Sequence, residues 1–541
     1  DNSFQAQNYL DEWQGVWNQT YKEKPSEDKE EFNIVGWINS YDSKPFSDSI
    51  MLEWTETTVE RILKLQPKKI LEIGCGTGLL LLRIAPFCKH YLGIDSSTKA
   101  IELLNKIVEQ RKVKNVVLLE AFADQIDNVE QNDYDVIIIN SVIQYFPNSE
   151  YLTKVLDKAM TKVVPNGAIF IGDIRSLCYQ YPFKTAVELY KSADNLPLKE
   201  LYNTVNEKLL LEEELLVDPE FFVSYSNNTS VPSGCQFILK KSIYRTEMSQ
   251  YRYDVTLFKN RNYTNLQTQD YIILDWKKEN LSMGQVEELL DNEPQGLIIN
   301  NIPNALVIDQ VLLTKMLENM VKELSVEEFK KLFSQQLEKQ ESINPYDLWK
   351  LESIKPYHVN IFWEEYENST IRAIFIHKDI YYNGMAFYHK FSSSLTHCTN
   401  NPLLSKYLNE VIKNIKDYSH KKLPEYMVPS EIKLLYKMPL TNSRKVNRTL
   451  LPNFKKVQNI PKVLPRSNEE QLLYDSLKEL ITESNISVEE NLIDLGLTSL
   501  SVIRWVMILR KYGINIRPQV VFMNPTIEKL AEIVSNSMHE N

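Results

Sequence analysis

Cysteine is scarce in this sequence, and the cysteines that occur are far apart. Only five are present among 541 residues, and no two of them form a CxxC pair. This pattern argues against a disulfide framework and against a cysteine-bound metal, and it is typical of reduced thiols in a cytosol. We therefore expect a cytoplasmic protein without a metal site.

Long apolar runs and an excess of positive charge are also absent. No apolar stretch is as long as a membrane span and no signal peptide is apparent at the start, so we expect no membrane association. The 72 acidic residues outnumber the 61 lysines and arginines, which leaves a net charge of −11. A broad surface for phosphate groups is therefore not expected, and we predict no nucleic-acid partner.

The chain is too long for a single hydrophobic core. With 541 residues, of which 43 % are hydrophobic and 25 % are charged, it has the size and composition of several soluble globular domains. It begins with Asp1 rather than with methionine, in a segment of helical character (4–21). We interpret it as a piece of a longer protein.

From Lys68 onward, segments with strand and helix patterns alternate. Helical spacing of apolar residues separates the expected strands, which are 68–74, 90–95, 115–121, 134–140 and 167–174. This alternation predicts a parallel sheet with helices on both faces. Two later β-rich runs, 236–244 and 251–259, are close enough in sequence to form an antiparallel pair at the sheet edge.

The pattern weakens beyond residue 268. Strands are expected at 271–276, 296–300 and 370–377, and a helix with a serine cap at 325–340, which predicts a smaller α+β region. Another unit begins near residue 400. Prolines in the segment 459–466 indicate a linker before a final helical segment.

A glycine-rich loop carries the first chemical signal. The run ILEIGCGTGLLLLRIA places Gly74, Gly76 and Gly78 between a buried strand and a helix. Glycine permits a sharp turn and close approach of a ligand, and the helix start offers free N–H groups. Asp95 ends the second strand, where a carboxylate can accept from both ribose hydroxyls. Asp124 follows the third strand and could accept from an adenine amino group.

These features resemble class I S-adenosylmethionine-dependent methyltransferases. A nicotinamide enzyme would share the loop and Asp95, but it needs neither Asp124 nor the antiparallel pair; a purely structural turn is the other reading of the loop. The resemblance implies a Rossmann-like α/β fold with a seven-stranded sheet. It places the cofactor against Glu72, Gly74, Cys75, Gly76, Gly78, Asp95, Ser96, Ala123, Asp124 and Asn140.

Four further stretches narrow the resemblance. FNIVGWINSY (32–41), NSVIQYFPNSEYL (140–152), IFIGDIRSL (169–177) and TEMSQYRYDV (246–255) resemble the methyltransferase domains embedded in nonribosomal peptide synthetases. Those domains interrupt an adenylation domain and mostly N-methylate the amino acid held on a neighbouring carrier. The resemblance implies two parts, a methyltransferase at 1–260 and an accessory α+β extension at 261–395.

The acceptor of the methyl group determines which side chains are needed. Transfer from a sulfonium is an in-line displacement, and a hydroxyl acceptor needs a base, usually histidine. No histidine lies between His90 and His358, and His90 starts a strand, away from the strand ends where substrate binds. An amine acceptor is therefore favoured, although a carboxylate could still serve as base.

Residues after the fourth and fifth strands are the candidates for substrate contact. We expect Asp173, Gln144 and Tyr145 to act in catalysis and Arg175 and Glu247 to contact the substrate. The alternative is that Tyr145 is a core aromatic residue and that Asp173 forms an ion pair with Arg175. The acidic run LLLEEELL (209–216) is typical of a solvated helix face.

The stretch 423–452 resembles the C-terminal subdomain of adenylation domains, because it combines PEYMVPS with PLT and KVNR. We expect a small α+β subdomain at 396–458. Lys445 matches the lysine that reaches the adenylate phosphate in that family, a role that suits an ammonium group. Ser443-Arg444 replaces the usual Asn-Gly, and Asn447 the usual Asp. The large adenylation core is missing, so Lys445 is either half of a split site or a relic.

The last segment, 467–541, resembles phosphopantetheine carrier domains with four helices. Asp494, Gly496 and Ser499 in DLGLTSL match their attachment motif. The resemblance implies 4′-phosphopantetheine on Ser499, added by a phosphopantetheinyl transferase, and a helix start favours the phosphodiester. The alternative is that Ser499 is an ordinary helix cap.

Together these parts predict a multidomain piece of a nonribosomal peptide synthetase. It would methylate the α-amine of an aminoacyl thioester held on its carrier, with an upstream adenylation core and downstream synthetase domains as partners. The alternatives are O- or C-methylation of the same carrier-bound amino acid, or a catalytically silent methyltransferase fold that spaces the carrier.

Overall fold

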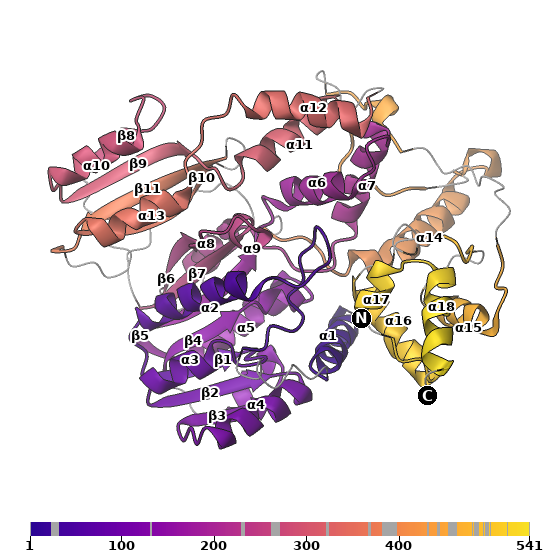
Figure 1. Cartoon of the computed structure of the whole chain (residues 1–541), viewed down its shortest axis with the longest axis horizontal. Coiled ribbons are helices and arrows are strands. Elements are labelled where there is room, and N and C mark those ends of the chain that lie inside the picture. Colours follow the sequence, from indigo (N-terminus) through magenta and orange to yellow (C-terminus); the bar gives the residue numbers. More distant parts are fainter. Residues whose placement is uncertain are drawn as a thin grey trace. The chain divides into compact units, whose positions relative to one another are not determined.

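The computed structural model forms two compact units, Asp1–Leu450 and Leu451–Asn541 (Figure 1). The structure describes residues 2–22, 32–129, 133–228, 233–260, 271–320, 324–365, 369–380, 398–429, 432–440, 444–452, 463–478, 480, 486–490, 492, 497, 499–516 and 518–539.

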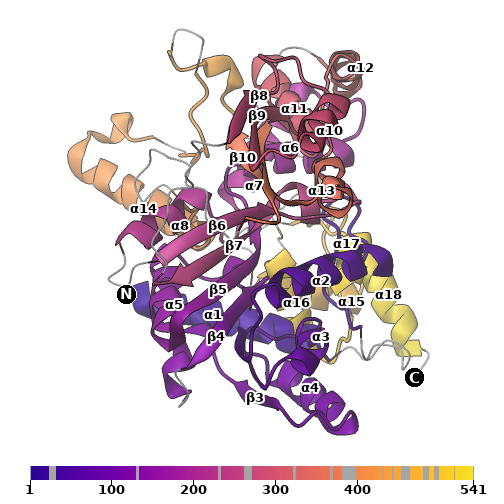
Figure 2. The same cartoon turned by 90° about the vertical axis from the view of Figure 1, so that its left-hand side faces the viewer.

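A seven-stranded sheet forms the centre of the first unit, with the strand order β3-β2-β1-β4-β5-β7-β6 (Figures 1 and 2). Strands β1 to β5 run parallel, whereas β7 is antiparallel to β5 and β6 is antiparallel to β7. The prediction of a parallel sheet with an antiparallel pair at its edge is confirmed. The strands are β1 (Lys69–Ile73), β2 (His90–Asp95), β3 (Val116–Glu120), β4 (Tyr134–Asn140), β5 (Val163–Arg175), β6 (Ser233–Leu239) and β7 (Arg252–Lys259).

Helices cover both faces of this sheet, as β1 illustrates. Ile70 packs with α2, α3 and α4, whereas Leu71 and Ile73 pack with α5 on the other face. Successive residues of a strand face opposite sides, so a strand that is covered twice is a continuous apolar run. The helices of this part are α1 (Asn2–Thr20), α2 (Asp48–Leu63), α3 (Leu81–Ile84), α4 (Thr98–Gln110), α5 (Ser149–Lys162), α6 (Gln180–Lys191), α7 (Leu198–Leu210), α8 (Pro219–Asn228) and α9 (Glu247–Gln250), with the 3-10 turns η2 (Ala85–Phe87), η3 (Ala123–Asn128) and η4 (Ile143–Tyr145).

A second sheet has four strands in the order β10-β11-β9-β8. Three of them were predicted, but β10 was not. The serine cap predicted for α12 is confirmed, since Ser325 and Glu328 cap each other's backbone N–H groups. The elements are β8 (Ile272–Asp275), β9 (Gly296–Pro303), β10 (Tyr357–Glu365), β11 (Thr370–His377), α10 (Met283–Asp291), α11 (Ile308–Met320), α12 (Val326–Leu337) and α13 (Pro345–Ile354).

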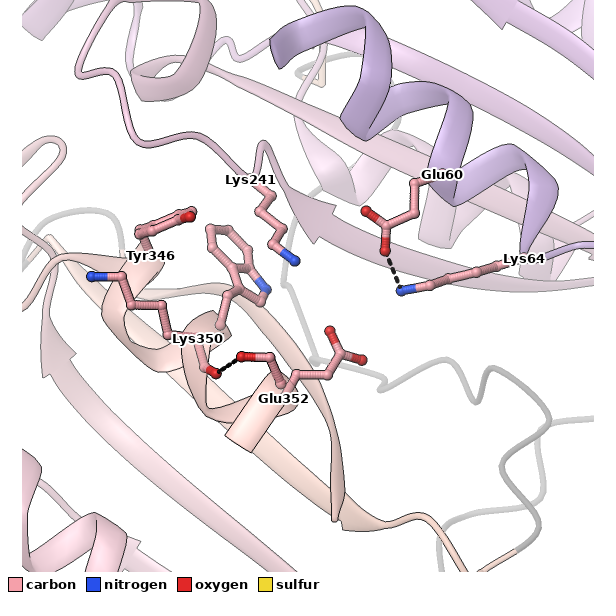
Figure 3. Close-up of a pocket in the computed structure, with 8 residues that line it drawn as sticks. Glu60, Lys64, Lys241, Tyr346, Lys350 and Glu352 are labelled. Atoms are coloured by element: carbon pink, nitrogen blue, oxygen red, sulfur yellow. Dashed lines mark hydrogen bonds and ion pairs between the residues drawn. The ribbon is translucent and has the colours of Figure 1, made fainter. Parts of the chain in front are cut away.

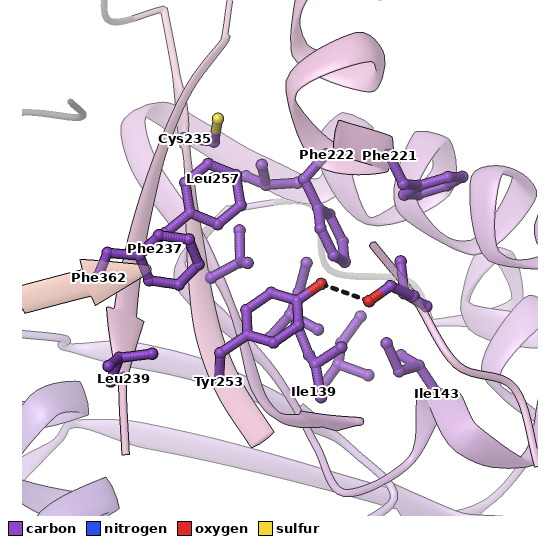
Figure 4. Packing of buried hydrophobic residues seen from close by; sticks show 14 of the residues in the cluster. Ile139, Ile143, Phe221, Phe222, Cys235, Phe237, Leu239, Tyr253, Leu257 and Phe362 are labelled. Atoms are coloured by element: carbon purple, nitrogen blue, oxygen red, sulfur yellow. Dashed lines mark hydrogen bonds between the residues drawn. The ribbon is translucent and has the colours of Figure 1, made fainter. Parts of the chain in front are cut away.

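The two sheets of the first unit share one hydrophobic core (Figure 4). Phe362 of β10 packs against Phe237 of β6, with 5.2 Å between ring centroids, and against Tyr253 of β7 at 6.0 Å. The Tyr253 hydroxyl donates a hydrogen bond to the carbonyl of Val217 at 3.0 Å. The four-stranded sheet is therefore packed directly on the antiparallel edge of the seven-stranded sheet.

The end of the first unit contains helix α14 (Leu404–Lys422) and the 3-10 turns η7 (Glu425–Met427) and η8 (Arg448–Leu450). In the described part of 396–458 the β-structure is limited to isolated bridges such as the one between Leu440 and Val446. The expected α+β subdomain therefore stays a prediction. Residues 459–462 of the expected linker lie outside the described residues.

The second unit contains helices α15 (Asn468–Lys478), α16 (Ser499–Lys511), α17 (Pro518–Met523) and α18 (Ile527–His539). Its core is built around Trp505, whose ring is fully buried and whose Nε1 donates to Ser476 Oγ at 2.9 Å. In the part of the chain that the structure describes, no helix combines the length and apolar character needed to cross a membrane.

Candidate functional site

The glycine loop turns between β1 and α3 with three glycines at positive φ angles, +78° at Gly74, +50° at Gly76 and +84° at Gly78. A Cβ on Gly74 would lie 2.2 Å from Val142, and a Cβ on Gly78 would lie 2.4 Å from Leu104. These two glycines are therefore required by packing as well as by backbone conformation. Gly76 is less confined, because the nearest atom to its Cβ position is the Tyr21 hydroxyl at 3.3 Å.

Asp95 joins the glycine loop to the end of β2. One carboxylate oxygen accepts from the Gly76 N–H and the other from the Ser97 N–H, both at 2.8 Å. Burial raises the pKa of Asp95, although both hydrogen bonds act to lower it. Each carboxylate oxygen keeps one lone pair, so the group can still accept from two hydroxyls. The residues present therefore fit the ribose of S-adenosylmethionine.

Helix α1 lies over this site, a role that the sequence pattern did not reveal. Gln14 Nε2 donates to the Ser96 carbonyl at 2.6 Å, and Asn18 Oδ1 accepts from Ser97 Oγ at 2.8 Å. Burial raises the pKa of Tyr21, as does the charge of the neighbouring Asp95. The sequence does carry one signal for the position of α1. Trp13, Trp17 and Tyr21 are four residues apart and thus share one helix face.

Tyr145 comes from η4 and lies between two aromatic rings of α1. Its centroid is 4.6 Å from that of Trp13 and 5.4 Å from that of Trp17. Burial raises the pKa of the Tyr145 hydroxyl, and the charge of Glu214 raises it further. Tyr145 is thus part of an aromatic cluster, as the alternative reading expected, and its role in catalysis stays a prediction.

Two buried amide oxygens at the end of β4 lack hydrogen-bond donors. Gln144 is only 3 % exposed and Asn140 7 %. Neither Gln144 Oε1 nor Asn140 Oδ1 has a partner among the described residues. A buried acceptor without a donor is costly, so these two atoms mark a place where a ligand with N–H or O–H groups fits.

Asp173 is occupied by protein donors. Its carboxylate is fully buried and accepts from Trp54 Nε1 at 2.9 Å, from Ser141 Oγ at 2.5 Å and from Arg252 at 2.5 Å. Its backbone has a φ of +62°, and its N–H donates to Asp254. This environment suits a residue that fixes the ends of β4, β5 and β7. It leaves little capacity for the proton transfer that the sequence suggested.

Arg175 does not bind Asp173, so the ion pair considered as an alternative is wrong. Its guanidinium binds Glu212 at 3.3 Å and Glu214 at 2.5 Å, because β5 turns Arg175 toward the segment that follows α7. The expectation of a solvated helix face at 209–216 is also wrong. Helix α7 ends at Leu210, and Glu212 is buried; burial alone would raise its pKa, but Arg175 and Lys184 lower it to about 2.

Glu247 holds another segment in place. Its two carboxylate oxygens accept from the N–H and the hydroxyl of Ser40, both at 3.0 Å. Burial raises the pKa of Glu247, although these hydrogen bonds and the nearby Arg252 act to lower it. Glu247 thereby fixes the segment 32–47 against α9.

Glu72 and Asp124, which were also predicted to contact the cofactor, have protein partners. Glu72 Oε2 accepts from the Tyr91 hydroxyl at 2.8 Å, and burial raises the pKa of Glu72 to about 8. Asp124 follows Ala123 in η3 and accepts from the Tyr151 hydroxyl at 3.0 Å and from Lys154 at 2.7 Å, so its carboxylate turns toward α5. An adenine amino group would have to share this carboxylate.

Lys445 and Ser499 lie far along the chain from the glycine loop, Asp95 and Tyr145. Lys445 is exposed, and the preceding Arg444 has a φ of +59°, a conformation that favours the glycine usual in the resembling family. Ser499 is the first residue of α16. Its side chain, like Asp494 and Gly496, lies outside the described residues.

A pocket of about 390 Å³ lies elsewhere in the first unit, between α2 and α13 (Figure 3). It is lined by charges of both signs, and Lys64 pairs with Glu60 at 3.0 Å. None of the residues predicted for cofactor or substrate lines this pocket, and it plays no part in the site described above. Its lining residues are Glu60, Lys64, Lys241, Tyr346, Trp349, Lys350, Glu352 and Ser353.

Two family models match the chain. Residues 71–169 match the model described as methyltransferase domain, and residues 471–534 match the model described as phosphopantetheine attachment site. The first match includes the glycine loop, Asp95 and Tyr145, and the second includes Ser499.

Curated relatives resemble nearly the whole chain. Chondramide synthase cmdD of Chondromyces crocatus is 30 % identical and covers 98 % of this chain. Nonribosomal peptide synthetase TES of Alternaria alternata is 26 % identical over 94 % of the chain, and the probable non-canonical nonribosomal peptide synthetase CymA of Salinispora arenicola is 25 % identical over 97 %. The chain spans only 14 %, 10 % and 6 % of the lengths of these relatives.

The fold and the glycine loop with Asp95 agree with the methyltransferase model, and Ser499 lies within the match to the phosphopantetheine model. A methyltransferase domain of this class uses S-adenosylmethionine, and a phosphopantetheine attachment site carries 4′-phosphopantetheine. The chain therefore contains an S-adenosylmethionine-dependent methyltransferase domain and a phosphopantetheine carrier domain, and over nearly its whole length it resembles segments of nonribosomal peptide synthetases.

Proposed function

We propose that the methyltransferase domain methylates the α-amine of an aminoacyl thioester that is carried on the phosphopantetheine of Ser499. The observation that supports an amine most strongly is the buried oxygen of Gln144, which has no donor among the described residues. An amine brings N–H groups that satisfy this acceptor and still keeps a lone pair for the methyl group. A carbon acceptor brings no such donor.

When bound, S-adenosylmethionine would supply an electrophilic methyl group. In the transfer a nitrogen–carbon bond forms and the carbon–sulfur bond breaks, with its electron pair going to sulfur. Asp95 and the glycine loop hold the cofactor end of the site. Trp13, Trp17 and Tyr145 shield the cofactor side of the site from water, and their rings favour a positively charged sulfur nearby. Gln144 orients the amine so that its lone pair faces the methyl carbon.

The proposal also explains the histidine-free core. A neutral amine needs no strong base, whereas a hydroxyl does. The sequence has no histidine between His90 and His358, and His358 lies on β10 beside Glu352 at 3.7 Å. We therefore place O-methylation second. The upstream adenylation core, the downstream synthetase domains and a phosphopantetheinyl transferase are the proposed partners.

Loading of the carrier tests the acceptor directly. The full chain is loaded on Ser499 with alanyl, valyl, phenylalanyl or seryl pantetheine groups, or with their N-acetyl analogues, and intact-protein mass is followed after addition of S-adenosylmethionine. We expect a gain of one methyl group on at least one free amine and none on the acetylated forms. A full methyl gain on an N-acetyl analogue would show that the acceptor is oxygen or carbon.

A further inference from the structure

We propose that Glu214 binds the α-ammonium group of the substrate and holds it next to Gln144. This inference rests on the proposed function, because it concerns the same amine. Glu214 belongs to the turn that follows α7, where the sequence pattern indicated only a solvated surface.

The backbone fixes Glu214 on the rim of the methyltransferase site. The N–H of Leu215 donates to the Gln144 carbonyl at 2.8 Å, which ties the turn to η4. Asn400 accepts from the Leu216 N–H at 2.8 Å and donates to the Glu214 carbonyl at 2.9 Å. The N–H of Val217 donates to the Arg175 carbonyl at 3.0 Å. The turn is therefore held from both sides, and its carboxylates have defined positions.

Two acids of this turn have different environments. Glu212 has a side chain that is only 7 % exposed, and its oxygens bind Arg175, Lys184 and the Glu214 N–H. The side chain of Glu214 is 29 % exposed, and only its Oε2 is bound, to Arg175. Among the described residues no group binds Glu214 Oε1. Glu212 thus holds Arg175 in place, and Glu214 keeps one oxygen available.

Glu214 lies next to the Leu215–Gln144 hydrogen bond, and thus close to η4. Its negative charge raises the pKa of Tyr145, the residue that adjoins Gln144 in η4. An ammonium group at this position donates one N–H to Glu214 Oε1 and another to the unpartnered Gln144 Oε1. A hydrogen bond between charged partners is stronger than one between neutral groups. The third proton passes to solvent water, which reaches the partly exposed Glu214, and the neutral amine then has a free lone pair.

The test compares Glu214→Gln with Glu213→Gln, which removes the same charge from the neighbouring residue of the turn. The full chain receives S-adenosylmethionine and the alanyl, valyl or phenylalanyl thioester of N-acetylcysteamine that wild type methylates fastest. We expect E214Q to raise the KM for the thioester by about ten- to a hundred-fold with a small change in kcat. E213Q should keep the wild-type KM, and the affinity of E214Q for S-adenosylmethionine should be unchanged.

Two further measurements separate binding of the ammonium from a structural effect. The α-hydroxyacyl thioester carries no ammonium, so it should inhibit wild type and E214Q equally. Glu214→Asp keeps the carboxylate, so its KM for the thioester should lie between the values of E214Q and wild type. A wild-type KM in E214Q, an equal loss of affinity for the hydroxy analogue, or no recovery in E214D would overturn the role of Glu214. Failure of wild type to methylate any free amine would instead overturn the proposed function.

Discussion

At the scale of single residues, burial of carboxyl groups dominates the chemistry of the methyltransferase domain. Glu72 and Asp95 lie at the ends of adjacent strands, and the Asp95 charge adds to the burial that raises the pKa of Glu72 to about 8. Asp173 is equally buried but has Arg252 as a close partner. Buried carboxyl groups therefore take different roles, because the neighbouring charges differ.

Glu72→Gln should make stability less dependent on pH. The folded pKa of Glu72, about 8, lies above its ordinary value of 4.5. Folded Glu72 thus keeps its proton while unfolded Glu72 loses it, so wild-type stability falls as pH rises from 4.5 to 8. At ~1.4 kcal/mol per pH unit, the loss for this residue amounts to ~5 kcal/mol.

Calorimetric unfolding of the cofactor-free chain at several pH values checks this prediction. The glutamine of the variant can still accept from Tyr91 and carries no proton to lose. The difference in stability between variant and wild type should grow in favour of the variant between pH 4.5 and 8 and stay level above pH 8. A difference that does not change with pH would contradict it.

Asp95→Ala should abolish measurable binding of S-adenosylmethionine. The substitution removes the predicted ribose acceptor and also leaves the N–H groups of Gly76 and Ser97 without their partner. Titration calorimetry measures the affinity, and the exposed Glu109→Gln on the following helix α4 is the matched control. Wild-type affinity in the alanine variant would remove Asp95 from the cofactor site.

At the scale of elements, the sequence predicted five of the seven strands because each is an apolar run between helices of clear periodicity, and the other two as neighbouring β-rich runs. It did not predict β10, where His358 and Asn360 interrupt the apolar residues. The position of α1 and the partners of Asp173 also escaped prediction. Arg252 is 79 residues away from Asp173, and a pattern read along the chain contains no information on which distant charge will be adjacent.

The packing of the two sheets gives a prediction about β10. Phe362→Ala should destabilise the first unit by about 3–5 kcal/mol, because the ring is buried against Phe237 and Tyr253 and its removal leaves a cavity. Chemical denaturation followed by circular dichroism measures the change. The exposed Ile354→Ala, at the end of α13, should change stability by less than about 0.5 kcal/mol. Separate transitions for the two sheets would contradict a shared core.

At the scale of the whole molecule, the methyltransferase and carrier belong to different compact units. In the proposed function, cofactor binding depends on residues of the first unit, and attachment of substrate depends on Ser499 in the second. Each function should therefore be removable without the other.

Ser499→Ala should leave both folds and the affinity for S-adenosylmethionine unchanged. Alanine lacks the oxygen that attachment needs, and the loss of a serine at a helix start costs only about 0.5–2 kcal/mol of stability. Methylation of carrier-bound substrate should be lost, whereas methylation of soluble N-acetylcysteamine thioesters should persist. Mass spectrometry of both substrates gives the comparison. Loss of activity on the soluble thioester as well would mean that the two units do not act separately.

The position of α1 has a consequence for the pace of the reaction. The contacts of Gln14 with Ser96 and of Asn18 with Ser97 hold α1 against the turn that follows Asp95, at the proposed cofactor site. We expect exchange of spent cofactor to require that these hydrogen bonds break and re-form. Opening of such a covering element, rather than the chemical step, often limits enzyme turnover. We therefore expect a rapid first methylation followed by a slower steady rate set by cofactor exchange.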